Sequence, residues 1–158
     1  MDHETGGVVA KLLMNTHDPF GGTKSYLVPA VFDRLDPILD VLRPILSGGP
    51  ASFVALCTMN LLLVEPRARH IDFMLAATEA WLERSGDDPA MWLELEIGRK
   101  FVDWFERASV DDPALMRPEH QQRALIDATL SRLVGFGVRE AHDLEMKIER
   151  SARAKNGR

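Results

Sequence analysis

The sequence predicts an all-α fold: a compact bundle of about six antiparallel or orthogonal helices around a central apolar helix. Apolar residues recur at spacings of three and four, which is the period of a helix face. Asp-Pro or Glu-Pro pairs and glycine-rich corners divide the chain into segments of helical length. No stretch shows the strict alternation of apolar and polar residues that is typical of a half-buried strand. A short solenoid of stacked α-hairpins is the alternative layout, although the uneven spacing of the helix starts favours the bundle.

The chain has 158 residues, of which 46% are hydrophobic and 27% are charged. A chain of this length and balance buries enough apolar surface to form one domain. Near the N-terminus, however, glycine pairs and an Asp-Pro step surround only a short apolar burst over residues 8–14. We therefore expect a loosely ordered N-terminal segment over residues 1–22 and a single helical domain over residues 23–158.

The first two predicted helices cover residues 23–35 and 36–46. Asp36-Pro37 starts the second, because aspartate is a good N-cap and proline fits the first helical position. Pro44 should kink or shorten it, because proline removes a backbone donor and crowds the preceding turn. A Ser-Gly-Gly-Pro sequence then ends this helix.

The next predicted helix, over residues 50–64, is apolar on nearly all sides. A buried strand is the competing interpretation for residues 61–64, but the run is long and only modestly β-branched. A helix without a polar face belongs in the middle of a domain. We therefore expect this helix to be the central one.

Two further helices are predicted over residues 66–85 and 89–108. Glu65-Pro66 starts the first, Ser85-Gly86 ends it, and Asp88-Pro89 starts the second. The second carries a wide apolar stripe, which indicates burial on two sides. The members of that stripe are Trp92, Leu93, Leu95, Ile97, Phe101, Val102, Trp104 and Phe105.

The last two predicted helices cover residues 118–134 and 138–152. The Gly135-Phe136-Gly137 sequence between them indicates a helix stop and a tight corner. The last helix has a narrow apolar stripe and an otherwise charged surface, so we expect it at the periphery. Before these helices, Asp112-Pro113 repeats the start chemistry of the Asp-Pro pairs upstream.

Composition narrows the class of protein and its partners. The formal net charge of −5 disfavours binding of nucleic acid by the whole domain, and the basic C-terminus fits the negative end of a helix dipole. The most apolar stretch, residues 51–64, is shorter than the ~20 residues of a membrane-spanning helix. With no secretory leader visible and one cysteine, Cys57, the expected compartment is the cytoplasm.

The sequence contains no catalytic motif. It lacks a Gly-x-Ser-x-Gly motif, a phosphate-binding loop and a His-Glu-x-x-His motif, so we expect no enzyme, no cofactor and no resident metal. An enzyme or metalloprotein built around His70, His120 or His142 is a remote alternative. These histidines lie near helix starts or on a charged helix, where we expect them to be solvated.

Five residues are the best candidates for an interface or a ligand pocket: Trp81, Trp92, Phe101, Trp104 and Asn60. Large rings at helical spacing usually fill a core. Trp92 and Trp104, however, lie about 120° apart around one helix, so one of them can reach a groove or an interface. Asn60 stands among apolar residues, where an unpaired amide costs on the order of 1–3 kcal/mol. We interpret it as an inter-helix hydrogen bond, with a contact inside a ligand cavity as the alternative.

The leading hypothesis is a non-enzymatic helical interaction module, either an accessory or regulatory subunit or a self-associating domain. The surplus of apolar helix surface and the lack of catalytic motifs both favour it. The second hypothesis is a sensor or carrier of an apolar small molecule, with a cavity lined by the tryptophan-bearing helices.

Overall fold

The computed structural model describes residues 39–40, 43, 52–85 and 91–156. It is all-α: the described residues include five α-helices and no strand, which confirms the predicted class. The helices are α4 (Ser52–Val64), α5 (Ile71–Ser85), α6 (Met91–Asp111), α7 (Arg123–Gly135) and α8 (Arg139–Asn156). Two short 3₁₀ helices, η1 (Ala68–His70) and η2 (Pro113–Met116), precede α5 and follow α6.

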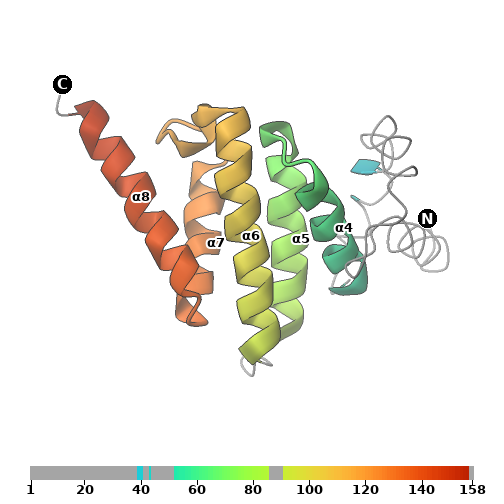
Figure 1. The fold of residues 1–158 in the computed structure, drawn as a ribbon. Helices are drawn as coiled ribbons and strands as arrows, with labels where there is room; N and C mark the ends of the chain where they lie inside the picture. Colours follow the sequence, from blue (N-terminus) through green and yellow to red (C-terminus); the bar gives the residue numbers. More distant parts are fainter. Residues whose placement is uncertain (1–38, 41–42, 44–51, 86–90, 157–158) are drawn as a thin grey trace.

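The helices stand side by side in chain order, with α4 at one end of the described row and α8 at the other (Figure 1). Each packs against the next helix and against the one after it, so α5 contacts α6 and α7, and α6 contacts α7 and α8. Within the described part of the chain, α6 therefore packs against all four other α-helices, whereas α4 packs mainly against α5 and α6. The expected bundle of six helices around residues 50–64 is not confirmed.

The predicted N-terminal segment and the helices over residues 23–35 and 36–46 lie outside the described residues. The exceptions are Leu39, Asp40 and Arg43, which are helical. The domain boundary after residue 22 thus stays a prediction. In the part of the chain that is described, no helix is both long enough and apolar enough to cross a bilayer.

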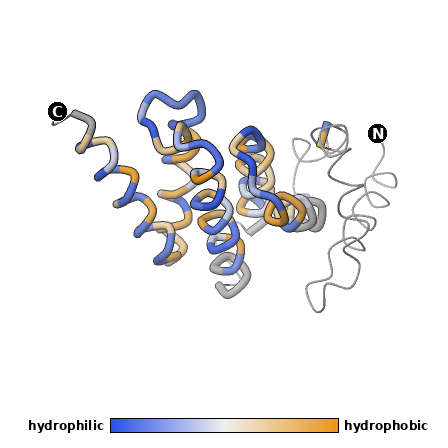
Figure 2. Tube along the Cα trace, turned by 45° about the horizontal axis from the view of Figure 1, so that its top comes forward, coloured by the Kyte–Doolittle hydropathy of each residue, from blue (hydrophilic) through white to orange (hydrophobic). Residues whose placement is uncertain are grey.

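The core is built from buried apolar side chains of all five described α-helices. Along these helices hydrophobic positions alternate with hydrophilic ones (Figure 2). On α6 the predicted stripe is buried at Ile97, Phe101, Val102, Trp104 and Phe105. The rings of Phe101 and Phe105 lie 6.1 Å apart, one turn along the helix. Burial of this stripe on a helix that touches four others agrees with the prediction that it is covered on two sides.

Two predicted helix starts are wrong, and both errors involve a proline. Pro66 does not start an α-helix, because Arg67 is extended and the chain first makes the 3₁₀ turn η1. Likewise α7 begins at Arg123 rather than near Pro118. Arg117 is extended, as steric conflict with a following proline favours, and turns fill the gap. Proline fixes its own φ angle but cannot ensure that a helix follows.

The corner between α7 and α8 confirms the predicted glycine stop. Gly137 has a positive φ of 87°, which glycine adopts without steric cost. Its N–H donates to the carbonyl of Val134 at 2.9 Å, and the N–H of Val138 donates to the carbonyl of Leu133 at 3.0 Å. These two bonds form a Schellman motif, with Leu133 and Val138 both buried.

A second glycine brings this corner close to α6. A Cβ atom built on Gly98 would lie 2.6 Å from one methyl group of Val138 and 2.9 Å from the other. Glycine in the middle of a helix costs about 1 kcal/mol relative to alanine. Here it permits the close contact that places the start of α8 against α6.

Candidate functional site

The structure places most of the predicted site residues in the core. Trp81 is 6% exposed, and Phe101 and Trp104 are completely buried. The side chain of Trp92 lies outside the described residues, so its predicted role is not tested. Three surface grooves are formed by described residues, and none of these three is lined by a phenylalanine, tyrosine or tryptophan.

Asn60 makes a contact between helices. Its side-chain oxygen accepts a hydrogen bond from Nζ of Lys100 on α6, at 2.9 Å. The residue is half-buried, and it lines none of the three grooves. This is the inter-helix bond that the sequence favoured, although the residue is less buried than expected.

The Asn60 contact belongs to a row of polar contacts that we call the α4–α6 seam. Lys100, Arg107 and Asp111 follow one another along one side of α6. Nη1 of Arg107 donates to the backbone carbonyl of Leu63 at 2.9 Å, near the C-terminal end of α4. A cation at this end of a helix also opposes its dipole. Trp104 lies on the same side of α6, between Lys100 and Arg107 at helical spacing.

The seam ends at Asp111, the last residue of α6. One carboxylate oxygen accepts a hydrogen bond from the backbone N–H of Ala68 at 3.1 Å, and the other from Arg67 at 3.0 Å. The Ala68 bond, followed by the Arg67 bond, lowers the pKa of Asp111. Arg67 also pairs with Glu65, and these two carboxylates raise its pKa. Asp111 thus ties the η1 corner to the end of α6.

His70 lies in this corner and corrects an expectation. Its place near a helix start predicts a solvated side chain, but His70 is 2% exposed. His70 is buried because the 3₁₀ turn η1 packs against α6, and this packing covers both Ala68 and His70. His120 is half-buried and its Nδ1 accepts a hydrogen bond from the N–H of Gln122, while His142 is exposed as predicted. Within the described residues, no group of three or more potential metal ligands is found.

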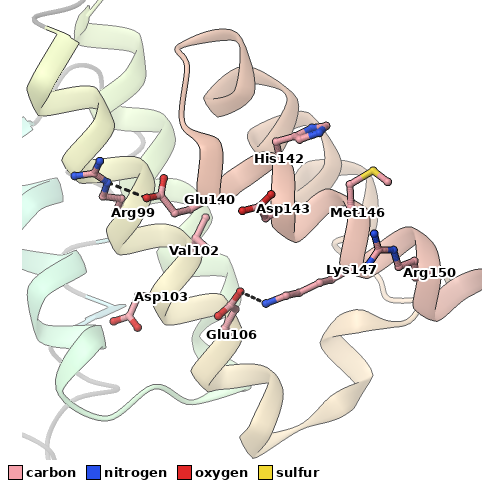
Figure 3. Close-up of a pocket in the computed structure, with 10 residues that line it drawn as sticks. All are labelled: Arg99, Val102, Asp103, Glu106, Glu140, His142, Asp143, Met146, Lys147 and Arg150. Atoms are coloured by element: carbon pink, nitrogen blue, oxygen red, sulfur yellow. Dashed lines mark hydrogen bonds and ion pairs between the residues drawn. The ribbon is translucent and has the colours of Figure 1, made fainter.

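The largest of the three grooves lies between α6 and α8 and has a volume of about 830 Å³ (Figure 3). We call it the α6–α8 groove. It is open to solvent, and mostly charged side chains line it. They are Arg99, Val102, Asp103, Glu106, Glu140, His142, Asp143, Met146, Lys147 and Arg150.

Two ion pairs bridge this groove. Nε of Arg99 lies 3.2 Å from a carboxylate oxygen of Glu140, and Nζ of Lys147 lies 2.8 Å from Glu106 (Figure 3). All four side chains are about half exposed, so solvent weakens both pairs. Val102, between the bridges, provides a small apolar floor. Such a groove offers charged groups on long side chains. It is therefore better suited to binding the surface of another protein than to enclosing an apolar ligand.

The two smaller grooves are also polar. One, of about 460 Å³, lies at the η1 corner and includes Asp111 and His70. The other, of about 370 Å³, lies between α7 and α8, where Arg123 is surrounded by Asp127, Glu145 and Glu149. Arg123 already pairs with Asp127 at 2.8 Å. Neither groove offers the apolar lining that the carrier hypothesis requires.

The chain was compared with protein families, curated proteins and solved structures. No protein-family model, no curated protein and no solved structure matches it. Any functional conclusion therefore depends on the geometry of the described residues.

The sequence predictions missed the α6–α8 groove. Its ion pairs join residues 41 positions apart, and no local pattern relates such positions. One signal was present: Met146 is the large apolar residue on the otherwise charged surface of the last helix. In the structure it is 37% exposed at the rim of this groove.

Proposed function

We propose that this chain is a non-enzymatic helical module that binds other proteins, as an accessory or regulatory subunit or by self-association. The observation that carries the proposal is the open, charged α6–α8 groove. The burial of Trp81, Phe101 and Trp104 in the core supports it, because these rings do not line any of the three grooves. Protein interfaces combine a small apolar centre with a polar and charged rim. Val102 and Met146, with the charged residues around them, provide that combination.

The order of helix contacts supports the same proposal. Contacts of each helix with the next helix and the one after it are typical of stacked α-hairpins, the alternative layout considered from the sequence. In such a stack, alternate helices such as α6 and α8 lie next to one another and form an extended surface. Stacked-hairpin proteins use surfaces of this kind to bind partners.

The groove can be tested with a charge-reversed variant. The full chain would be immobilised, and proteins captured from a lysate of the source cells would be identified and then purified. Binding of each purified protein would be compared between the wild type and Arg99→Glu/Lys147→Glu. We expect at least one partner whose affinity falls about tenfold or more in this variant.

Glu79→Lys/Arg132→Glu is the matched control, because both positions are exposed and make no ion pair in the described part of the chain. The control should bind like the wild type. If the wild type captures no protein and is also monomeric in solution at every concentration, the proposal is wrong. Equal binding by the wild type, the charge-reversed variant and the control would exclude the groove as the binding site.

A further inference from the structure

The N-terminus of α7 is not capped by its own N-cap residue. The first backbone N–H groups of an α-helix have no partner within the helix, and a side chain at the N-cap usually accepts from one of them. At α7 the N-cap residue is Gln122, and its side chain makes no such bond. That side chain donates to a carboxylate oxygen of Asp72 on α5 instead. The start of α7 therefore depends on other acceptors.

The imidazole of His120 is one of these acceptors. Its Nδ1 accepts a hydrogen bond from the backbone N–H of Gln122 at 3.0 Å. The backbone carbonyl of His120 accepts from the N–H of Arg123, also at 3.0 Å. In a capping box a carboxylate or amide side chain accepts from the N-cap N–H. Here a half-buried histidine ring takes that role.

This bond exists in only one charge state of the ring. Neutral imidazole has a proton on one nitrogen and a lone pair on the other, whereas imidazolium donates from both nitrogens. The bond to Gln122 therefore requires a neutral His120 with its proton on Nε2. Protonation of Nδ1 would set two N–H donors against each other. It would also add a positive charge close to the positive end of the α7 dipole.

The charged side chains of this corner come from the segment before α7, from α7 itself and from α5. They are Arg117, Glu119, Arg123, Asp127 and Asp72. Between about pH 5 and pH 8 carboxylates and guanidinium groups keep their charge, whereas imidazole changes its charge. His70, buried in η1 two residues before the start of the Asp72 contact, is a second histidine in this part of the structure. A test must therefore separate His120 from His70.

We infer that His120 is a pH-sensitive cap of α7. The bond to Gln122 is made while the ring is neutral, and it is lost as the pH falls through the range in which the ring takes up a proton. The contribution of this cap to stability is thus present at neutral and higher pH and absent in acid. The inference does not depend on the proposed function.

Loss of the cap also affects the contact between α7 and α5. Gln122 joins the two helices through its side chain, and its backbone carbonyl accepts from the N–H of Ile126 at 2.9 Å. Fraying of the first turn of α7 weakens both bonds. The rest of α7 stays in place, because Leu130 and Leu133 are completely buried. Acid therefore loosens the start of α7 from α5 by local opening rather than by unfolding the protein.

Hydrogen exchange measured by NMR on the full chain tests the cap. The reporters are the backbone N–H groups of Gln122 and Ile126, with each rate corrected for the intrinsic pH dependence of exchange. In the wild type the protection of both groups should fall about fivefold between about pH 7.5 and about pH 5, which corresponds to the loss of a typical helix cap.

Two substitutions of His120 separate its capacity to accept from its titration. In His120→Asn the amide oxygen takes about the position of Nδ1, so the acceptor is kept and the titration is removed. Protection should then be the same at both pH values. In His120→Gln the oxygen takes about the position of Nε2, away from Gln122, so protection should be low at both. His142→Asn removes an exposed histidine and should behave like the wild type.

Nitrogen NMR of the ring gives a readout that fraying alone does not move. At neutral pH the His120 ring should carry its proton on Nε2. The chemical shift of the Gln122 N–H should change with the same midpoint as protonation of this ring.

Four results would overturn the inference. They are equal protection of the wild type at both pH values, a pH-dependent loss that persists in His120→Asn, wild-type protection in His120→Gln, and a neutral ring with its proton on Nδ1. The second result would assign the effect to another group, with His70 the first to examine. None of the four decides the proposed function, which depends on the partners captured through the α6–α8 groove.

Discussion

The two sides of α6 are joined to their neighbours in different ways. On the α4 side, Arg107 binds a backbone carbonyl, Asp111 binds a backbone N–H, and Lys100 binds a half-buried amide. On the α8 side, two half-exposed ion pairs bridge an open groove. A backbone group is fixed by its own helix, whereas an exposed side chain must lose conformational freedom to stay paired. The α4–α6 seam is therefore expected to be rigid and the α6–α8 groove adaptable.

The largest effect should come from the core beneath the seam. Trp104→Ala should lower the free energy of unfolding by about 3–5 kcal/mol, because it removes a completely buried ring. Trp104→Phe should cost much less, since the indole N–H has no hydrogen-bond partner among the described residues. Urea unfolding followed by circular dichroism measures both values. Similar losses for the two variants would contradict this account of the core.

The next largest effect is expected where α6 meets the start of α8. Gly98→Ala should cost about 1–3 kcal/mol, because the added Cβ would overlap the methyl groups of Val138. Gly135→Ala is the matched control: no atom lies within 4 Å of its Cβ, and its φ is not positive. This control should be neutral or slightly stabilising.

The same contact allows a rescue experiment. In a Val138→Ala background the obstructing methyl groups are absent, so the additional cost of Gly98→Ala should largely disappear. If Gly98→Ala lowers the free energy of unfolding equally in both backgrounds, the close approach of Val138 is not the reason that glycine is needed at position 98.

A smaller effect, which depends on pH, is expected from Asp111. Its pKa is lower in the folded protein than the ordinary 3.8, so its ionised form is stabilised by folding. This contribution is fully present above pH 3.8 and is lost as the pH falls through the lower pKa of the folded state. Asp111→Asn should destabilise the protein at neutral pH and remove this part of the acid sensitivity.

The measurement is the free energy of unfolding at neutral pH and at a series of acidic values. Asp143→Asn is the matched control, because that carboxylate is exposed and makes no hydrogen bond or ion pair in the described part of the chain. If both variants show the same pH dependence, the Asp111 contacts do not stabilise the seam.

The smallest effect should come from the bridges across the groove. A double-mutant cycle with Lys147→Met and Glu106→Gln should give a coupling energy of about 0.2–1 kcal/mol, and added salt should reduce it. A larger coupling that resists salt would mean that this side of α6 is as rigid as the α4 side.

The local features of the fold were accessible from the sequence. The end of α5 at Ser85, the end of α4 at Val64 and the glycine corner after α7 all agree with the predictions. Each depends on residues within a few positions of one another: caps, helix breakers and the period of apolar side chains. Where such a signal was ambiguous, as at Pro66 and Pro118, the predicted start was wrong by about five residues.

The arrangement of the helices was decided by tertiary structure. Apolar character alone suggested residues 50–64 as the centre, but in the described part of the chain the helix that meets all others is α6. Periodicity showed that Trp92 and Trp104 point in different directions, but only packing shows that Trp104 is buried. Similarly, Asn60 was recognised as an unusual residue, whereas its partner Lys100 lies 40 positions away.

By itself, therefore, the sequence determined that this chain is helical, where most of its helices end and which of their sides are apolar. Tertiary structure alone determined that α6 and α8 border an open, charged groove. The physical reason is the distance along the sequence over which each kind of interaction acts. Helix formation depends on bonds and contacts over about four residues, whereas grooves depend on which distant apolar stripes bury one another.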